Sequence, residues 1–199
     1  MMITAHSGCD NLPANSEEYI RHACSLPVDA LEVDVRRSSD GSLILTHNPP
    51  ETGQEYITLT RAFDIIRDTD IVINCDLKEK YLEHDVLTAA KTSRIESERI
   101  IFTGTLTDWR QKIPNVWVNA EEISRDFSED VIILAESYGY EVMNIDYHLW
   151  DKNIMERHNI KYSLWTIDDP REMIYSPCII NITTNYPTEI ISAIKHMIR

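Results

Sequence analysis

Short apolar runs alternate with segments of helical periodicity along the whole chain. The run MITAHS, for example, precedes SEEYIRHACSL, whose apolar residues recur at the spacing of one helix face. The same reading predicts eight strands, each followed by a helix, that begin near residues 2, 30, 71, 99, 115, 141, 161 and 178. Strict alternation of strand and helix is typical of a parallel sheet.

Eight such units predict an α/β fold, a (β/α)8 TIM barrel formed by a single domain over residues 1–199. The predicted helices include short ones near DWRQKI and DPREMIY. An open doubly wound sheet is the alternative, but its usual first turn is GxGxxG, and the first turn here reads HSGCDN. No linker, low-complexity tract or internal repeat divides the chain, so we expect one barrel domain.

The run SLILTH does not fit this alternation. Only RRSSDGS separates it from the second strand, ALEVDV, whereas a parallel crossover needs about a dozen residues or more. The pair Asp40-Gly41 is a strong turn signal. We therefore predict that SLILTH runs antiparallel to the second strand, as a hairpin at the top of the barrel. This hairpin would bring His47 back toward Glu32 and Asp34.

Polar residues occur in phase on neighbouring predicted strands. Because strand side chains alternate with a period of two, Glu32 and Asp34 share one face of ALEVDV. Asp76 and Lys78 share one face of IVINCDLK in the same way, and the first strand ends in His6. Taken alone, each strand fits an amphipathic strand with its acids in water. In a parallel barrel, however, residues late in the strands line the active-site mouth, and we expect these side chains to meet there.

Three carboxylates that converge without a cation repel one another and raise one another's pKa values. Glu32, Asp34 and Asp76 therefore predict a divalent metal site, and all-oxygen ligation favours Mg²⁺ or Ca²⁺ over zinc. His6 and His47 beside such a metal predict a pair of acid–base catalysts.

Charge and composition restrict the partners. A net charge of −14 argues against nucleic acid or an anionic membrane surface as the main partner. The start MMITAHSG lacks the features of a signal peptide, and no apolar run is long enough to span a membrane, so no integral membrane segment is expected. The four cysteines form no CxxC and lie in or beside apolar segments, which predicts reduced thiols in a cytoplasmic protein.

The order of short motifs resembles that of the glycerophosphodiester phosphodiesterases. That family has His-Arg-Gly, Pro-Glu-Asn-Thr, Glu-Leu-Asp-Val, a hairpin ending His-Asp, a strand close to Ile-Glu-Ile-Lys, a late Trp-Thr strand and a closing Thr-Asp-x-Pro. The corresponding segments here are AHSG, PANS, LEVDV, LTHN, NCDLK, LWTI and TNYP. The resemblance runs from His6 to Pro187, and it implies a (β/α)8 barrel that hydrolyses glycerophosphodiesters to glycerol 3-phosphate and an alcohol.

Carried over by position, the resemblance implies a role for each motif residue. It makes His6 and His47 the catalytic histidines, Glu32, Asp34 and Asp76 the metal ligands, and Lys78 and Trp165 substrate-binding residues. It also implies a divalent cofactor and a small-molecule phosphodiester substrate. The usual small inserted domain after the hairpin is missing, because only PPETGQEYI precedes the next helix, and this predicts a more open mouth.

Five positions depart from the family motifs. Ser7 stands where the family has arginine, and Ala14 and Asp76 stand where it has glutamate. Asn48 and Asn185 stand where it has aspartate. The lost arginine leaves the phosphate without its usual bidentate partner. Lys78 is the first candidate to replace it. Arg36 is the second, because it lies on the face of Glu32 and Asp34.

Two functions follow from these residues. The first is a metal-dependent phosphodiesterase whose nucleophile is either water or a neighbouring hydroxyl of the substrate, which would form a cyclic phosphate. The second is a barrel that binds a phosphorylated metabolite without turnover, and the lost arginine motivates it. Because both histidines and all three acids are present, we favour the enzyme. The identity of the alcohol, the choice of metal and the existence of a homo-oligomer stay open.

Overall fold

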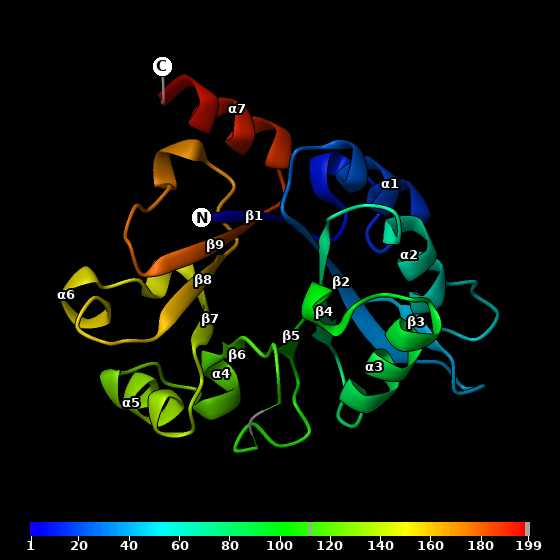
Figure 1. Ribbon diagram of the computed structural model, residues 1–199, viewed down its shortest axis with the longest axis horizontal. Coiled ribbons are helices and arrows are strands. Elements are labelled where there is room, and N and C mark those ends of the chain that lie inside the picture. Colours follow the sequence, from blue (N-terminus) through cyan, green and yellow to red (C-terminus); the bar gives the residue numbers. More distant parts are fainter. Residues whose placement is uncertain (112, 198–199) are drawn as a thin grey trace.

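Parallel strands form the wall of a barrel in this computed structural model, which describes residues 1–111 and 113–197 (Figure 1). Around the barrel, the strands follow the order β5-β4-β2-β1-β9-β8-β7-β6. Their bounds are β1 (Met2–Ala5), β2 (Ala30–Arg37), β4 (Val72–Leu77), β5 (Ile100–Gly104), β6 (Val118–Asn119), β7 (Val142–Asp146), β8 (Lys161–Trp165) and β9 (Ile179–Thr184). All seven neighbouring pairs in this order are parallel, as the alternation of strand and helix predicts.

The seam between β5 and β6 closes the barrel with little strand pairing. Phe102 forms a parallel bridge with Val116. The Phe102 amide donates to the Asn115 carbonyl at an N···O distance of 3.0 Å, and the Trp117 amide donates to the Phe102 carbonyl at 2.9 Å. Both distances are typical of backbone hydrogen bonds. These contacts join the two ends of the strand order, so the predicted barrel is confirmed.

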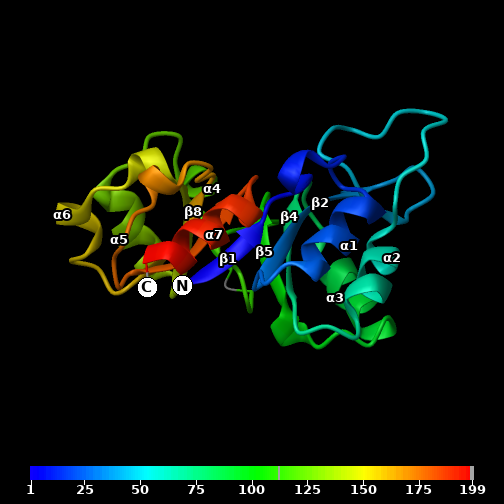
Figure 2. The ribbon, with the colours of Figure 1, turned by 90° about the horizontal axis from the view of Figure 1, so that it is seen from above.

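Helices cover the outside of the barrel on two sides (Figures 1 and 2). Figure 2 shows α1, α2 and α3 on one side of the strands and α5 and α6 on the other. The bounds are α1 (Glu17–Ser25), α2 (Leu59–Ile66), α3 (Glu83–Thr92), α4 (Ala120–Ile123), α5 (Glu129–Ser137), α6 (Lys152–Met155) and α7 (Pro187–Met197). Short 3-10 helices are η1 (Cys9–Asn11), η2 (Ser97–Arg99), η3 (Tyr147–Leu149) and η4 (Pro170–Glu172). No helix within the described residues is long and apolar enough to cross a membrane.

Two of the predicted helices are wrong. The segment DWRQKI contains a turn, and its Lys112 lies outside the described residues. Asp108 Oδ1 accepts from the Arg110 amide at 3.1 Å, a local hydrogen bond that competes with helix formation. The segment DPREMIY forms only the 3-10 turn η4, after which Met173 returns to an extended conformation.

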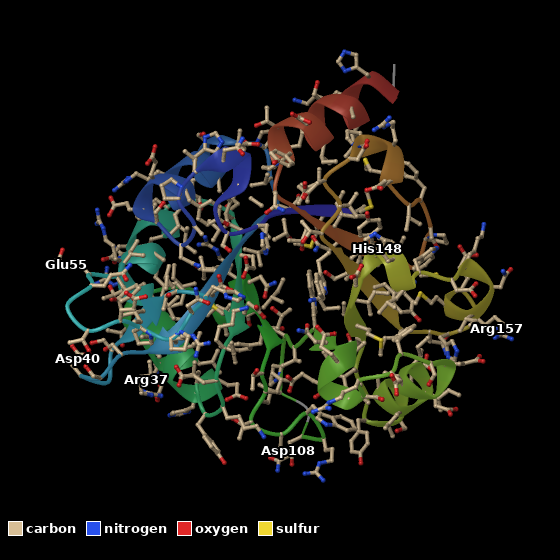
Figure 3. All side chains as sticks on the ribbon, turned by 180° about the vertical axis from the view of Figure 1, so that it is seen from behind. Arg37, Asp40, Glu55, Asp108, His148 and Arg157 are labelled. Carbon is tan, nitrogen blue, oxygen red and sulfur yellow. The ribbon has the colours of Figure 1, made fainter. Side chains whose placement is uncertain are left out.

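The predicted hairpin is present as β3 (Leu43–Leu45), which pairs antiparallel with the end of β2. Gly41 adopts a φ of +91° in the connecting turn, a conformation that glycine tolerates without steric cost. Asp40, at the tip of the hairpin, lies at the outer edge of the molecule (Figure 3). Beyond β3, the Thr46 amide donates to the Asp34 carbonyl at 3.0 Å, which holds the returning chain beside β2.

The two faces of β2 have opposite environments. Its apolar residues Leu31, Val33 and Val35 are fully buried. Burial of a side chain of this size contributes about 1.5–3 kcal/mol. Tyr19 of α1 is also fully buried, and its Oη lies 2.8 Å from the carbonyl oxygen of Glu32. The helix is therefore fixed against β2, whose alternate residues face the inside of the barrel.

Candidate active site

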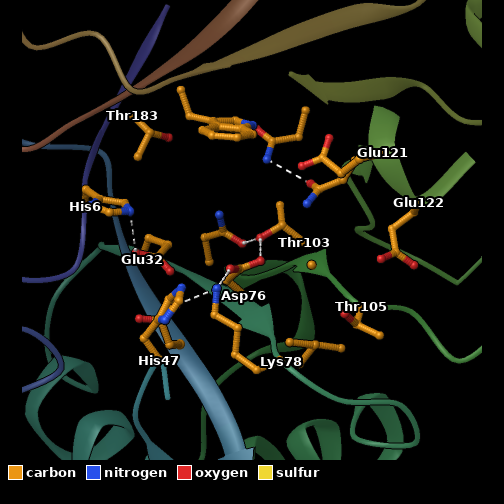
Figure 4. A pocket seen from close by; sticks show the side chains of 17 residues that line it. His6, Glu32, His47, Asp76, Lys78, Thr103, Thr105, Glu121, Glu122 and Thr183 are labelled. Carbon is orange, nitrogen blue, oxygen red and sulfur yellow. Dashed lines mark hydrogen bonds and ion pairs between the residues drawn. The ribbon is translucent and has the colours of Figure 1, made fainter. Parts of the chain in front are cut away.

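A cavity of about 400 Å³ opens at the carboxyl ends of the strands (Figure 4). The sequence-predicted residues in its lining are His6, Glu32, Asp34, His47, Asp76, Lys78 and Trp165. They come from the ends of β1, β2, β4 and β8 and from the segment after β3. The cavity therefore brings together segments that are far apart in the sequence, at the barrel face where active sites of this fold lie.

Three carboxylates form the acidic centre of the cavity. Oxygen atoms of Glu32, Asp34 and Asp76 all lie within 4.8 Å of one another. The strand register explains the geometry, because Asp34 of β2 pairs directly with Asp76 of β4. Glu32 and Asp34 are only 4% and 3% exposed, so little water screens their charges.

Lys78 lies among these acids and pairs with two of them. Its Nζ is 2.8 Å from Asp34 Oδ1 and also contacts Asp76 Oδ2. Burial alone disfavours the charged amine, but the neighbouring charge of Asp76 and the hydrogen bond to Asp34 outweigh it, and the pKa of Lys78 is raised. Burial likewise opposes ionisation of Asp34, yet Lys78 and Asn15 lower its pKa. Lys78 is therefore a fixed positive charge at the mouth.

Glu32 forms no ion pair with a lysine or arginine of the described residues. Burial, followed by the charges of Asp34 and Asp76, raises its pKa well above the usual range. The Ser7 amide donates to Glu32 Oε2 at 2.9 Å, and His6 Nε2 lies 3.8 Å from the same oxygen. These contacts offset the cost of the buried carboxylate only in part.

The composition of this cluster fits a hard divalent cation. Three carboxylates and one ammonium group carry a net charge of −2 when all are ionised, and a divalent ion balances it. Carboxylate oxygens at this spacing are the donors that Mg²⁺ and Ca²⁺ prefer. Glu32, Asp34 and Asp76 are therefore the residues of the cavity that could hold the ion.

Asn15 holds Asp34 in place through both ends of its amide. Asn15 Nδ2 donates to Asp34 Oδ2 at 2.6 Å, and the Asp34 amide donates to Asn15 Oδ1 at 2.9 Å. Asn15 itself adopts a φ of +54°, which asparagine tolerates better than most residues. The sequence analysis did not assign Asn15 to the site, although the PANS segment aligned with a family motif that contains this asparagine.

The two histidines lie above and below Glu32 in the close-up view (Figure 4). His6 Nδ1 is 2.7 Å from Asn185 Oδ1, and the His6 amide donates to the Thr184 carbonyl at 2.9 Å. His47 is exposed, and its Nδ1 lies 3.4 Å from Asn48 Oδ1. His6 is thus held by β9 and the loop after it, whereas His47 is more accessible to solvent.

The two arginines at the end of β2 lie outside the cavity lining. Arg36 Nε donates to the His47 carbonyl at 3.0 Å, so it supports the segment that carries this histidine. Arg37 points to the other side, where Nη2 pairs with Asp85 at 2.5 Å, and it lies at the outer edge of the molecule (Figure 3). Lys78 is the one lysine or arginine among the described lining residues.

Glu121 and Glu122 of α4 line the far side of the cavity, opposite the histidines (Figure 4). Asn119 at the end of β6 and Asn144 of β7 also line the cavity. Burial raises the pKa of Glu121, with smaller effects of neighbouring acids. The sequence analysis missed these residues. The segment NAEE lies at the end of a predicted strand, and residues at the carboxyl ends of barrel strands line the active-site mouth.

The fold and the site together define a parallel-stranded barrel with an acidic, histidine-containing cavity at the carboxyl ends of its strands. A sequence model of the glycerophosphoryl diester phosphodiesterase family matches residues 6–145, and the chain belongs to this family. None of the curated proteins compared with it matches.

Solved structures agree with this barrel over nearly their whole length. A putative glycerophosphoryl diester phosphodiesterase from Agrobacterium tumefaciens has a TM-score of 0.83 at 14% identity, with 100% of this chain and 99% of that chain covered. A glycerophosphodiester phosphodiesterase from Thermotoga maritima has a TM-score of 0.75 at 18% identity, with 96% and 97% covered. A phosphodiesterase from Oleispira antarctica, in complex with the product sn-glycerol-3-phosphate, has a TM-score of 0.75 at 16% identity, with 98% and 97% covered.

Proposed function

We propose that this protein is a metal-dependent phosphodiesterase with histidine acid–base catalysis. It hydrolyses a glycerophosphodiester, or a related phosphodiester, to a phosphomonoester and an alcohol. The observation that carries the proposal is the meeting of three carboxylates, two histidines and one lysine in a single cavity. Membership of the glycerophosphoryl diester phosphodiesterase family supports the same reaction class.

The proposed metal ligands are Glu32, Asp34 and Asp76. A divalent cation bound there would supply positive charge to the phosphate oxygens, and the all-oxygen donors suit Mg²⁺ or Ca²⁺. Lys78 provides a second positive charge on the same side, in the place of the missing arginine at Ser7. Trp165 lines the cavity and offers an apolar surface to the substrate.

The proposed acid–base pair is His6 and His47. With the hydrogen on Nδ1 shared with Asn185, neutral His6 keeps a lone pair on Nε2, which is suited to take a proton from the nucleophile. His47 lies at the accessible side and protonates the leaving alkoxide. Arg36 donates a hydrogen bond to the carbonyl of His47. We propose that it contributes to substrate binding indirectly, because it positions the segment that carries His47.

The direct test is product release from a panel of glycerophosphodiesters with Mg²⁺, Ca²⁺ or Mn²⁺, followed by ³¹P NMR. We expect a phosphomonoester, and a transient cyclic phosphate if a substrate hydroxyl attacks. His6→Ala and His47→Ala should each lower turnover by about 10²-fold or more. The matched control is His196→Ala, because His196 is exposed on α7, is not among the cavity residues, and bonds to the Ser192 carbonyl.

Binding of the diesters without release of any product would contradict the enzyme and favour a binding protein. Near-normal turnover in His6→Ala or in His47→Ala would remove that residue from the mechanism.

A further inference from the structure

A chain of hydrogen bonds connects His6 to a carboxylate that does not reach the cavity. His6 Nδ1 lies 2.7 Å from Asn185 Oδ1. On the other side of the same amide, Asn185 Nδ2 donates to Asp168 Oδ2 at 2.8 Å. The backbone amide of Asn185 donates to Asp168 Oδ1, also at 2.8 Å, and Thr184 Oγ1 lies 3.2 Å from that oxygen.

The carboxylate fixes the orientation of the Asn185 amide. An ionised carboxylate only accepts hydrogen bonds, so the NH₂ group of Asn185 must face Asp168 and the oxygen must face His6. A flipped amide would place its oxygen against Asp168 Oδ2 and lose this bond. With only an acceptor before it, Nδ1 of His6 must carry the hydrogen, and in the neutral ring Nε2 is then free of hydrogen.

We propose that Asp168 is a positioning residue that sets the tautomer of His6 through Asn185. This inference rests on the proposed function, because it gives the fixed tautomer its use: the nitrogen without hydrogen is the one nearer the acidic centre, 3.8 Å from Glu32. It also accounts for Asn185, which stands where the family motif has aspartate. An asparagine can contact a histidine and a carboxylate at once, whereas an aspartate there would face Asp168 with like charge.

The proposal makes a specific forecast for Asp168→Asn. The new amide has one acceptor oxygen, but the backbone N–H and the side-chain NH₂ of Asn185 both need one. If the oxygen keeps the backbone bond, the new NH₂ faces the side chain of Asn185, which then turns its oxygen toward position 168. The NH₂ of Asn185 now faces His6, so Nδ1 becomes an acceptor and the hydrogen moves to Nε2.

The exchange of the two residues should reverse this change. In Asp168→Asn combined with Asn185→Asp, the carboxylate at position 185 accepts from His6 Nδ1 and from the new amide at position 168. The His6 tautomer is then the same as in the unmodified protein. Asp169→Asn is the matched control, because Asp169 is a neighbouring aspartate that pairs with Arg171 at the surface.

The experiment combines imidazole NMR with kinetics. Long-range ¹H–¹⁵N spectra of ¹⁵N-histidine protein, recorded where the rings are neutral and assigned with His6→Gln, report which nitrogen of His6 carries the hydrogen. We expect Nδ1–H in the unmodified protein, the exchange variant and Asp169→Asn, and Nε2–H in Asp168→Asn. The turnover number of Asp168→Asn should fall by about 10²-fold with little change in KM, and the exchange should restore most of it.

Two results would overturn the proposal: Nδ1–H retained in Asp168→Asn, or an exchange variant with the tautomer of the single variant. If Asp168→Asn does not fold, the exchange variant alone decides, since Asp168 as a purely structural anchor predicts no recovery of turnover or tautomer. If the unmodified protein hydrolyses no diester, the proposed function fails, while the NMR spectra still decide whether Asp168 sets the tautomer.

Discussion

At the scale of single residues, charge balance around Lys78 decides how the cavity treats a phosphate. The ammonium group pairs with Asp34 and Asp76, and neither Arg36 nor Arg37 lines the cavity. Ser7, which stands where the family has an arginine, uses its amide for Glu32 and lies with its hydroxyl 3.3 Å from Asp34. The residue therefore supports the acids, and we propose that Lys78 takes over recognition of the phosphate.

Lys78→Ala should lower kcat/KM for a phosphodiester by the equivalent of about 3 kcal/mol, the usual loss for a group that stabilises charge in the transition state. Arg36→Ala should show a smaller loss, because Arg36 acts only through the carbonyl of His47. Arg37→Ala is the control, since its guanidinium pairs with Asp85 away from the cavity. If Lys78→Ala and Arg36→Ala both behave like Arg37→Ala with the same diester, neither Lys78 nor Arg36 replaces the missing arginine.

Gly104 tests the packing behind Asp76. A Cβ at this position would lie 2.4 Å from Asp76 Oδ1 and 2.4 Å from the Leu77 carbonyl, and the residue has a φ of +77°. Gly104→Ala should therefore weaken cation binding and destabilise the fold. Gly53→Ala is matched to it, because Gly53 has a φ of +86° and nothing within 4 Å of its Cβ position.

The free energy of unfolding of Gly104→Ala should fall by about 1–3 kcal/mol more than that of Gly53→Ala, since forced contacts in a packed site cost that amount. Urea unfolding gives the two values. Equal losses in both variants would mean that the positive φ alone, and not the contact with Asp76, requires the glycine.

At the scale of elements, the sequence predicts best those parts of the site that follow a regular pattern, such as strand periodicity or a turn motif. The period of two placed Glu32 and Asp34 on one face of a strand, and Asp40-Gly41 predicted the return of His47. Asn15, Asp168 and Asn185 lie outside strands and helices, and no periodicity shows which way a side chain in a loop points. The helix predicted near residues 169–175 is only the 3-10 turn η4, which Asp169 caps and which ends where Met173 returns to an extended backbone. Near residues 108–111, Asp108 bonds locally to the Arg110 amide in a turn.

The contact between α1 and α2 carries a pH dependence. Glu17 of α1 accepts hydrogen bonds from Arg61 of α2 and Arg21 of α1, and these lower its pKa from 4.5 to about 2. A lowered pKa in the folded state stabilises the protein above the unfolded pKa, and this contribution is lost as the pH falls from about 4.5 to about 2.

Glu17→Gln should therefore flatten the decline of the urea midpoint over this pH range and leave the protein less stable at neutral pH. The effect is small because the pair is exposed to solvent. Glu18→Gln is the control, as Glu18 is exposed in the same helical turn. A midpoint that falls equally in the unmodified protein and in Glu17→Gln would exclude this ion pair as a source of acid sensitivity.

At the scale of the whole molecule, a protein with a net charge of −14 has to attract an anionic substrate to a cavity lined by five carboxylates, those of Glu32, Asp34, Asp76, Glu121 and Glu122. Lys78 balances only one of these charges. The barrel holds the first three acids on neighbouring strands at positions set by the sheet register, so their mutual repulsion cannot be relieved by movement of the backbone. A divalent cation at this point would balance the remaining charge of Glu32, Asp34 and Asp76 beside Lys78.

The most direct measurement is hydrolysis of a glycerophosphodiester by protein treated with EDTA and then titrated with Mg²⁺ or Ca²⁺, with the phosphomonoester followed by ³¹P NMR. We expect no turnover after chelation, saturable recovery with added cation, and a higher half-saturating concentration for Glu32→Gln. Full turnover in the presence of the chelator, or the same cation dependence in Glu32→Gln as in the unmodified protein, would contradict the claim that these carboxylates hold a catalytic metal.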